Sequence, residues 1–206
     1  MRLKPPVVTP GTSTFTQQFF KNKAGGGSEI CPDNQVVTLQ DKDGTTINLG
    51  IFGALVDTGR KPWAEYSDWT ESVRKSYASL QPKSDVVVAL THLNVADDKK
   101  LAAMLPKVTL IMGGHEHENQ IHKVGTTVIT KADANAKTVY IHTLRYDKKK
   151  GVCTVKSELR KVDNAIVDEP NTAAVVAKWE KIKNEALLAA GINPDNVVTK
   201  LNKPLD

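Results

Sequence analysis

Two short apolar runs, each ending in histidine, constrain the fold of this 206-residue chain more than any other feature. The run Asp85–Leu90 is followed by Thr91-His92, and the run 108–112 is followed by Gly113-Gly114-His115-Glu116-His117. Runs this short and this uniformly apolar predict buried strands of a parallel sheet rather than amphipathic helices or membrane spans. Ligands of open α/β sheets bind at the carboxyl ends of such strands. We therefore expect three imidazoles to converge at one sheet edge.

Imidazoles that meet at a rigid sheet edge favour a divalent metal. His115 and His117 are two positions apart, so in an extended segment both side chains would point to the same side. His92 would arrive from the neighbouring strand, and the glycine pair allows the backbone to approach closely and turn sharply without a Cβ clash. Neutral imidazole is a good ligand for Zn, Mn, Fe or Co. A lone histidine at a strand end is usually structural, but the combined pattern predicts a metal site.

The remaining pattern predicts an α/β fold with hairpins around one strand–helix–strand crossover. Because the two apolar runs flank a helix that ends before Pro106, the crossover makes them parallel. Three further strand pairs are expected, at residues 36–39 with 46–52, 120–124 with 127–131, and 138–146 with 152–162. Two further helices are expected, one from Asp68 or Thr70 to about residue 80 and one from Pro170 to about residue 190.

Composition excludes two classes of partner. The net charge is +5, but only 5% of the residues are aromatic, which argues against nucleic-acid binding. No apolar stretch reaches the roughly 20 residues of a membrane helix, and the start of the chain has no apolar core typical of a signal peptide. Cys31 and Cys153 are compatible with a disulfide and equally with two free thiols.

At this point the chain resembles a known family. Leu90-Thr91-His92, the helix start at 97–102 and the motif 113–117 resemble the C-terminal half of a calcineurin-like metallophosphoesterase domain, in its 5′-nucleotidase branch. The segments 47–53 and 130–137 resemble the same domain, and the similarity covers about residues 36 to 163. The resemblance implies a four-layer α/β/β/α sandwich with mixed sheets.

The resemblance also implies a function. His92 and His115 would bind one ion of a two-metal centre and His117 the other, for hydrolysis of a nucleotide phosphate monoester by a metal-bound hydroxide. Asn135 would contact the substrate if the family's loop is kept, although a plain turn asparagine is the alternative. Members of this branch are often periplasmic, extracellular or surface-held, but the sequence does not fix the compartment.

The chain departs from the family in one important respect. The printed sequence contains no Asp-x-His, Gly-Asp or Asn-His motif, which supply the carboxylates and the general acid in the family. We therefore expect a truncated or divided form that lacks the N-terminal half, holds at most one ion weakly and is inactive alone. The expected organisation is an irregular lead-in (1–35), a partial catalytic domain (36–165), and a helix with a linker (166–206) toward an absent C-terminal domain.

The sequence leaves the partner and the exact function open. The partner of the chain would be the missing half or a second copy. A catalytically dead binding module on the same scaffold, or a sibling phosphodiesterase or nucleotide-sugar hydrolase, is the alternative function. Among the other polar residues we expect Asp97 and Asp98 to cap the helix after His92, Glu116 to be solvated or to support a ligand, and His122 and His142 to be structural.

Overall fold

The computed structural model describes residues 2–3, 33–57, 64–196 and 199. Cys31 and most of the expected lead-in therefore lie outside the described residues. The chain divides into two compact units, Met1–Val162 and Asp163–Asp206. The first unit contains the sheet and the histidines. Its short strand β1 (Arg2–Leu3) pairs with β4 (Ala64–Glu65) in antiparallel fashion.

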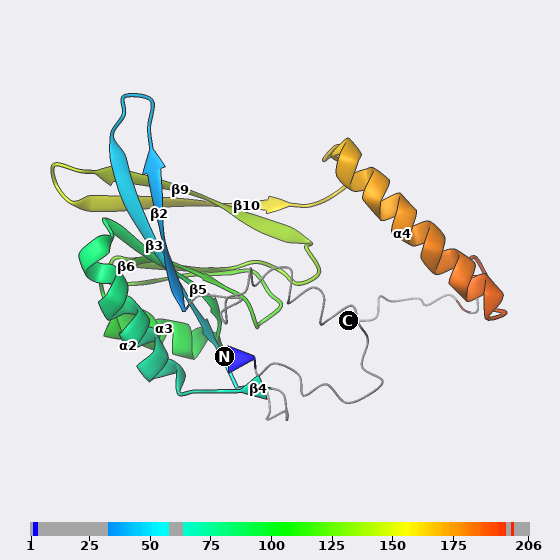
Figure 1. Ribbon diagram of the computed structural model, residues 1–206, viewed down its shortest axis with the longest axis horizontal. Helices are drawn as coiled ribbons and strands as arrows, with labels where there is room; N and C mark the ends of the chain where they lie inside the picture. The colour runs from blue at the N-terminus through cyan, green and yellow to red at the C-terminus, as the bar shows by residue number, and fades with distance from the viewer. Residues whose placement is uncertain (1, 4–32, 58–63, 197–198, 200–206) are drawn as a thin grey trace, which may run out of the picture. The chain divides into compact units, whose positions relative to one another are not determined.

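A six-stranded mixed sheet forms the centre of the first unit (Figure 1). Its order is β2-β3-β5-β6-β8-β7, with bounds Asn34–Gln40, Thr46–Leu55, Val86–His92, Val108–Gly113, Thr127–Lys131 and Gln120–Val124. The four inner strands are parallel, and the edge strands β2 and β7 are antiparallel to their neighbours. The predicted crossover and both predicted edge hairpins are confirmed. The parallel order brings the ends of β5 and β6 to the same edge.

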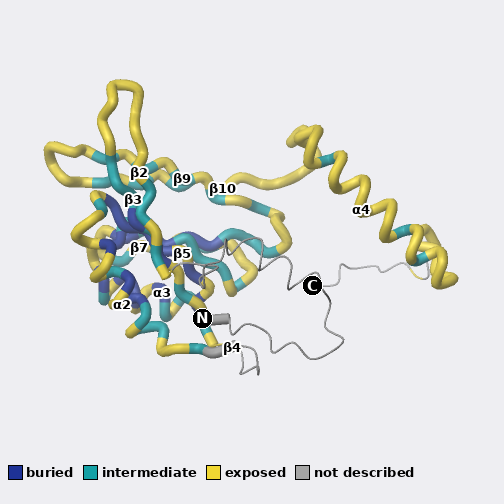
Figure 2. The backbone as a smooth tube through the Cα atoms, viewed as in Figure 1, coloured by how far each residue is buried: buried dark blue, intermediate teal, exposed yellow. Residues whose placement is uncertain are grey.

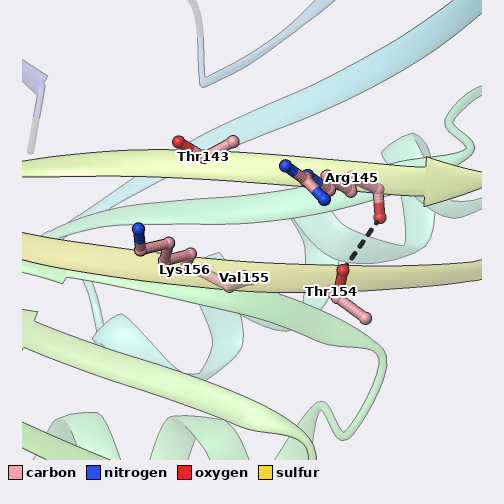
Figure 3. Close-up of a pocket in the computed structure, with 5 residues that line it drawn as sticks. All are labelled: Thr143, Arg145, Thr154, Val155 and Lys156. Atoms are coloured by element: carbon pink, nitrogen blue, oxygen red, sulfur yellow. Dashed lines mark hydrogen bonds between the residues drawn. The ribbon is translucent and has the colours of Figure 1, made fainter.

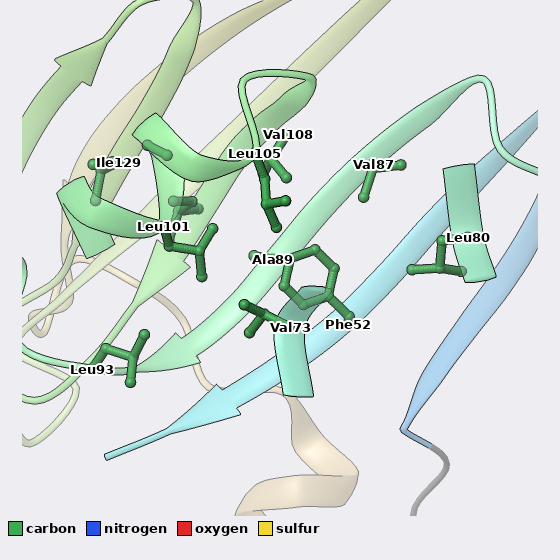
Figure 4. Close-up of a cluster of buried hydrophobic side chains, with 12 residues drawn as sticks. Phe52, Val73, Leu80, Val87, Ala89, Leu93, Leu101, Leu105, Val108 and Ile129 are labelled. Carbon is green, nitrogen blue, oxygen red and sulfur yellow. The ribbon is translucent and has the colours of Figure 1, made fainter. Parts of the chain in front are cut away.

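Helices α2 (Trp69–Leu80) and α3 (Val95–Met104) pack on one face of the sheet. The Asp68 side chain accepts hydrogen bonds from the backbone N–H of Thr70 and Glu71, as an N-cap does, and a 3₁₀ turn, η1 (Gln81–Lys83), follows α2. A cluster of buried apolar side chains forms the core under these helices (Figure 4). It consists of Phe52, Val73, Leu80, Val87, Ala89, Leu93, Leu101, Ala102, Leu105, Val108, Ile111 and Ile129.

The antiparallel hairpin of β9 (Thr138–Asp147) and β10 (Val152–Lys161) lies on the opposite face of the sheet (Figure 1). The buried apolar cluster beneath it is small, with Val86, Val88 and Leu110, and half-buried side chains such as Leu144 and Val155 pack around them. Figure 2 shows the same contrast, with dark blue confined to the inner strands and the helix side. The predicted α/β class with a mixed sheet is confirmed, and the described layers are helices, sheet and hairpin.

The second unit is described by one helix, α4 (Pro170–Ala189). The Glu169 carboxylate accepts hydrogen bonds from the N–H groups of Asn171 and Thr172, and Pro170 occupies the first turn. Gly191 follows with a φ of +77°, which ends the helix as expected. The apolar side chains Val175 and Trp179 are exposed. In the described part of the chain, no helix combines the length and apolarity needed to cross a bilayer.

Candidate functional site

Two of the three predicted histidines meet at the carboxyl edge of the sheet. His92 is the last residue of β5, and His115 follows the end of β6 by two residues. Their rings lie 5.3 Å apart between centroids, at 84° to each other, and both residues are exposed. The convergence expected from the parallel pairing of β5 and β6 is therefore found for this pair. Two exposed imidazoles edge to face can turn their nitrogens toward one ion.

His117 occupies a different environment. The prediction that residues 115–117 are extended is wrong, because residues 115–118 form bends and both His115 and His117 have left-handed backbones, with φ of 86° and 61°. The side-chain alternation of an extended strand therefore does not apply to His115 and His117. Within residues 33–57 and 64–196, no group of three or more His, Cys, Asp or Glu side chains lies in an arrangement that could hold a metal ion.

The donor set was tested against the two-metal centre that the resemblance implies. His92 and His115 offer two nitrogen ligands, which is fewer than the three or four that protein-bound transition metals usually have. The carboxylates of Asp98 and Glu116 pair with Lys131 instead. The described residues thus supply two ligands of one metal ion and do not fit a complete two-metal centre.

The glycine pair before His115 is required by close packing. A Cβ on Gly114 would lie 3.0 Å from Nδ1 of His92, and a Cβ on Gly113 would lie 3.1 Å from Oδ2 of Asp98. The close approach predicted for these glycines is confirmed. The sharp turn, in contrast, falls on the histidines, since His115 and His117 carry the positive φ angles. A positive φ is uncommon for a residue with a Cβ, although histidine adopts it more often than most residues, and strained backbones of this kind cluster at functional sites.

A buried lysine joins the loops that carry the two histidines. Lys131, at the end of β8, is 1% exposed, and its ammonium lies 2.8 Å from Oδ2 of Asp98 and 2.5 Å from Oε2 of Glu116. The same nitrogen donates to the carbonyls of Leu93 at 2.6 Å and Gly114 at 2.7 Å. Four oxygens from three segments therefore surround one ammonium. A buried charge is stable only when it is paired in this way.

The two carboxylates respond differently to this environment. Burial raises the pKa of Asp98, and the hydrogen bonds from Lys131 and Thr91 only partly offset it. Burial also acts to raise the pKa of Glu116, but the hydrogen bonds from Lys131 and from the Val95 N–H outweigh it, and the pKa is lowered. Glu116 is less deeply buried than Asp98 and lies closest to the ammonium. The charge of Lys131 is thus balanced first by Glu116.

A second loop, between β8 and β9, is tied to the histidine loop. The Ala134 N–H donates to the carbonyl of His117 at 3.1 Å. Asp133 accepts hydrogen bonds from Asn119 and Thr138, and these bonds lower its pKa. Asn135, the predicted substrate contact, is exposed in the same loop with a φ of 59°. This is the backbone of a turn asparagine, and the substrate contact stays a prediction.

Two expected caps are wrong, and the role of one residue was missed. Neither Asp97 nor Asp98 caps α3; the cap is Asn94, whose side chain accepts a hydrogen bond from the Asp97 N–H, and Asp98 is fully buried against Lys131. The role of Lys131 was not predicted, because a single lysine at a strand end normally lies on the surface. The sequence did hold a clue, because Asp98 lies one turn before Leu101 and Ala102 and so shares the buried face of α3 with them. A carboxylate on a buried face needs a partner of opposite charge.

Two features lie away from this edge. A hollow of about 410 Å³ on the outer face of the hairpin is lined by Thr143, Arg145, Thr154, Val155 and Lys156 (Figure 3). The hollow contains none of the predicted site residues. On the inner face, His142 has hydrogen-bond partners in Ser157 at 2.9 Å and Thr130 at 3.3 Å, which agrees with a structural role.

Comparison with known proteins gives one consistent fold. No family model matches the chain. The chain is 29% identical over 51 residues to the uncharacterized metallophosphoesterase YunD of Bacillus subtilis, a match that covers 25% of this chain and 11% of YunD. Among solved structures it is similar to a putative 5′-nucleotidase from Staphylococcus aureus in complex with alpha-ketoglutarate, with 15% identity and a TM-score of 0.54 over 75% of this chain and 35% of that one.

It is also similar to the sulfate thiohydrolase SoxB of Thermus thermophilus in complex with glycerol, with 17% identity and a TM-score of 0.61 over 75% of this chain and 29% of SoxB. The chain thus spans about a third of the length of each solved structure or less. Together these likenesses confirm the resemblance to the calcineurin-like metallophosphoesterases at the level of the fold.

Proposed function

We propose that this chain contributes the histidine part of a metal centre for phosphate ester hydrolysis, of the 5′-nucleotidase type. The observation that carries the proposal is the contact of the His92 and His115 rings at the carboxyl edge of a metallophosphoesterase-like sheet. The proposed substrate is a nucleotide phosphate monoester. The proposed cofactor is a divalent ion from the set Zn, Mn, Fe and Co.

Bound divalent ions would offset the charge that develops on phosphoryl oxygens during hydrolysis. His92 and His115 would hold one such ion together, His92 from the end of β5 and His115 from the bend that follows β6. His117 is proposed as a ligand of the second ion, from the neighbouring bend. The carboxylates that bridge ions in the family would come from polypeptide outside the printed sequence, because the motifs that carry them are absent from it.

The proposal is tested by metal titration of the whole chain. Calorimetric titration with Zn²⁺, in a buffer that does not chelate, is expected to show weak binding of a single ion. His92→Ala and His115→Ala should each abolish it, because each removes one of two nitrogen ligands. The matched control is His122→Ala on β7, where the side chain bonds to Gln120 and leaves the ion's ligands intact. Binding that survives the His92 and His115 substitutions would refute the proposed site.

A second measurement addresses catalysis. The chain alone is expected to show no turnover of p-nitrophenyl phosphate with Mn²⁺, because two imidazoles cannot replace the missing carboxylates. Turnover that disappears in His115→Ala would contradict this expectation and would mean that another chain or a dimer supplies the carboxylates.

A non-catalytic binding module on the same scaffold is the second candidate function. It is favoured by the two-nitrogen donor set and the lack of a third metal-binding side chain near it in the described ranges. The two candidates separate in one experiment. Adding a polypeptide that carries the Asp-x-His, Gly-Asp and Asn-His motifs should restore phosphatase activity for the divided enzyme and leave the binding module inactive.

A further inference from the structure

The ammonium of Lys131 contacts the residues that flank both histidines. The carbonyl of Leu93, next after His92, accepts from Nζ at 2.6 Å. The carbonyl of Gly114, directly before His115, accepts from the same atom at 2.7 Å. The two acceptors belong to different strand ends, β5 and β6. One side chain therefore joins the backbone beside one imidazole to the backbone beside the other.

Side chains reinforce these two backbone contacts. Glu116, directly after His115, pairs with Nζ of Lys131 through Oε2, and its Oε1 accepts a hydrogen bond from the Val95 N–H near the start of α3. Asp98 pairs with Nζ through Oδ2 at 2.8 Å, and its Oδ1 accepts from the Thr91 hydroxyl at 2.7 Å. Thr91 directly precedes His92. Each histidine is therefore flanked on both sides by residues in contact with the Lys131 cluster.

We propose that Lys131 is a positioning residue that sets the spacing of the His92 and His115 rings, acting through Leu93, Gly114 and Glu116. The effect of Lys131 on ring spacing is independent of the proposed function; only its effect on metal affinity rests on that function. An ammonium has three protons, which the four surrounding oxygens share. Leu93, Asp98 and Lys131 are buried, so water cannot easily replace the partner that each of them would lose if its contact broke.

The strained backbone at His115 supports a positioning role. Its φ of 86° is unfavourable for a residue with a Cβ and persists only where neighbouring contacts enforce it. The enforcing contacts flank His115 directly, since Gly114 and Glu116 both bind Lys131. An apolar side chain in place of Lys131 would fill the same volume without holding either one. The ammonium is therefore needed for geometry rather than for packing.

The sharpest test replaces Glu116, because it is the least buried member of the cluster and its removal leaves Lys131 paired with Asp98. Glu116→Ala is compared with Glu118→Ala, which removes the same charge from the same exposed loop outside the cluster. The first readout needs no metal. In histidine-labelled whole chain, NMR reports the ring-current shift that the edge-to-face contact of His92 and His115 produces, and His115→Ala gives the reference for its loss.

Glu116→Ala is expected to move the His92 ring resonance toward its position in His115→Ala, while Glu118→Ala leaves it unchanged. The second readout is Zn²⁺ affinity, which should fall about 10-fold or more in Glu116→Ala only, the size usual for residues that orient metal ligands. Thermal unfolding of both variants identifies any general loss of structure, which would broaden all resonances rather than shift those of His92.

The outcomes separate this inference from the proposed function. A shifted His92 ring in a chain that binds no Zn²⁺ supports the positioning role and refutes the proposed metal site. An unshifted ring with unchanged Zn²⁺ affinity in Glu116→Ala overturns the positioning role and leaves the metal site standing. Lys131→Met, where it folds, must reproduce the Glu116→Ala shift; a wild-type His92 resonance in that variant also overturns the inference.

Discussion

The two faces of the central sheet differ in how their strands end. On the helix side, the rows of apolar residues in β5, β6 and β8 end in Thr91, Gly113 and Lys131, which are covered by α3 through Asp98. On the hairpin side, the row Val86 and Val88 continues into Leu90, which is 58% exposed, and His92, which is also exposed. The helix side is closed and buries even the charged Lys131, whereas the hairpin side is open and leaves Leu90 and His92 exposed to solvent.

The same strands therefore provide a rigid support on the helix side and an accessible site on the hairpin side. The closed face excludes water from Lys131, so its contacts are strong and hold the strand ends in place. The open face leaves His92 and Leu90 available to whatever binds there. Because side chains alternate along a strand, adjacent residues such as Thr91 and His92 serve opposite faces. A rigid support and an accessible site can thus be one residue apart.

The largest effect is expected from Lys131→Met, which breaks the closed face. Removing one member of a buried ion pair leaves Asp98 uncompensated, and the free energy of unfolding should fall by about 3–5 kcal/mol. The measurement is urea denaturation of the whole chain. Lys123→Met on β7, where the lysine is exposed, is the control and should change stability by less than about 0.5 kcal/mol. Equal losses in both variants would show that the Lys131 cluster does not support the fold.

Core truncations compare the two faces directly. Leu101→Ala, in the fully buried core under α3, should cost about 2–5 kcal/mol, because it leaves a cavity that the packed helices cannot close. Leu144→Ala in the hairpin should cost clearly less, since Leu144 is only half-buried and water can reach the space. Denaturant midpoints of the two variants give the ranking, and a reversed order would mean that the hairpin side holds the main core.

Leu90→Thr tests how open the hairpin face is. Threonine is β-branched and suits a strand, and the exposed Leu90 contributes little packing, so stability should change by less than about 0.5 kcal/mol. Leu110→Thr on the same face is the buried counterpart and should be strongly destabilising. A large loss in Leu90→Thr would mean that this leucine is covered in solution, for instance by self-association, and sedimentation of both chains would then reveal the oligomer.

The smallest expected effect concerns pH. Burial between the hairpin and the sheet lowers the pKa of His142 from its usual value of 6.5. The unfolded chain therefore binds this proton at higher pH than the folded chain does, and stability should decline as the pH falls below about 6.5. His142→Gln keeps a hydrogen-bonding side chain and should weaken that decline between pH 7.5 and 5.5. An identical pH dependence in wild type and variant would show that His142 is not the group responsible.

Much of the fold was predictable because it follows local rules. Alternation and turn residues predicted the hairpins, and uniform apolarity predicted the inner strands β5 and β6. The cap at Asp68 and the helix that begins at Pro170 were also predicted correctly. His115 and His117 were predicted to be extended, because the turn was expected at the glycine pair, and this prediction is wrong. Packing against Asp98, Lys131 and His92 uses those glycines for close approach, so the positive φ angles fall on the histidines.

By itself the sequence determined the parallel core, the meeting of His92 with His115 and the likeness to the metallophosphoesterases, because periodicity and short motifs are local. Only the tertiary structure decided that His117 bends away from an extended path and that Asp98 and Glu116 face one buried ammonium. Asp98, Glu116 and Lys131 lie far apart in the sequence, on α3, on the loop after β6 and at the end of β8. A charge buried among them is stable only when all three arrive together, and no local pattern records that requirement.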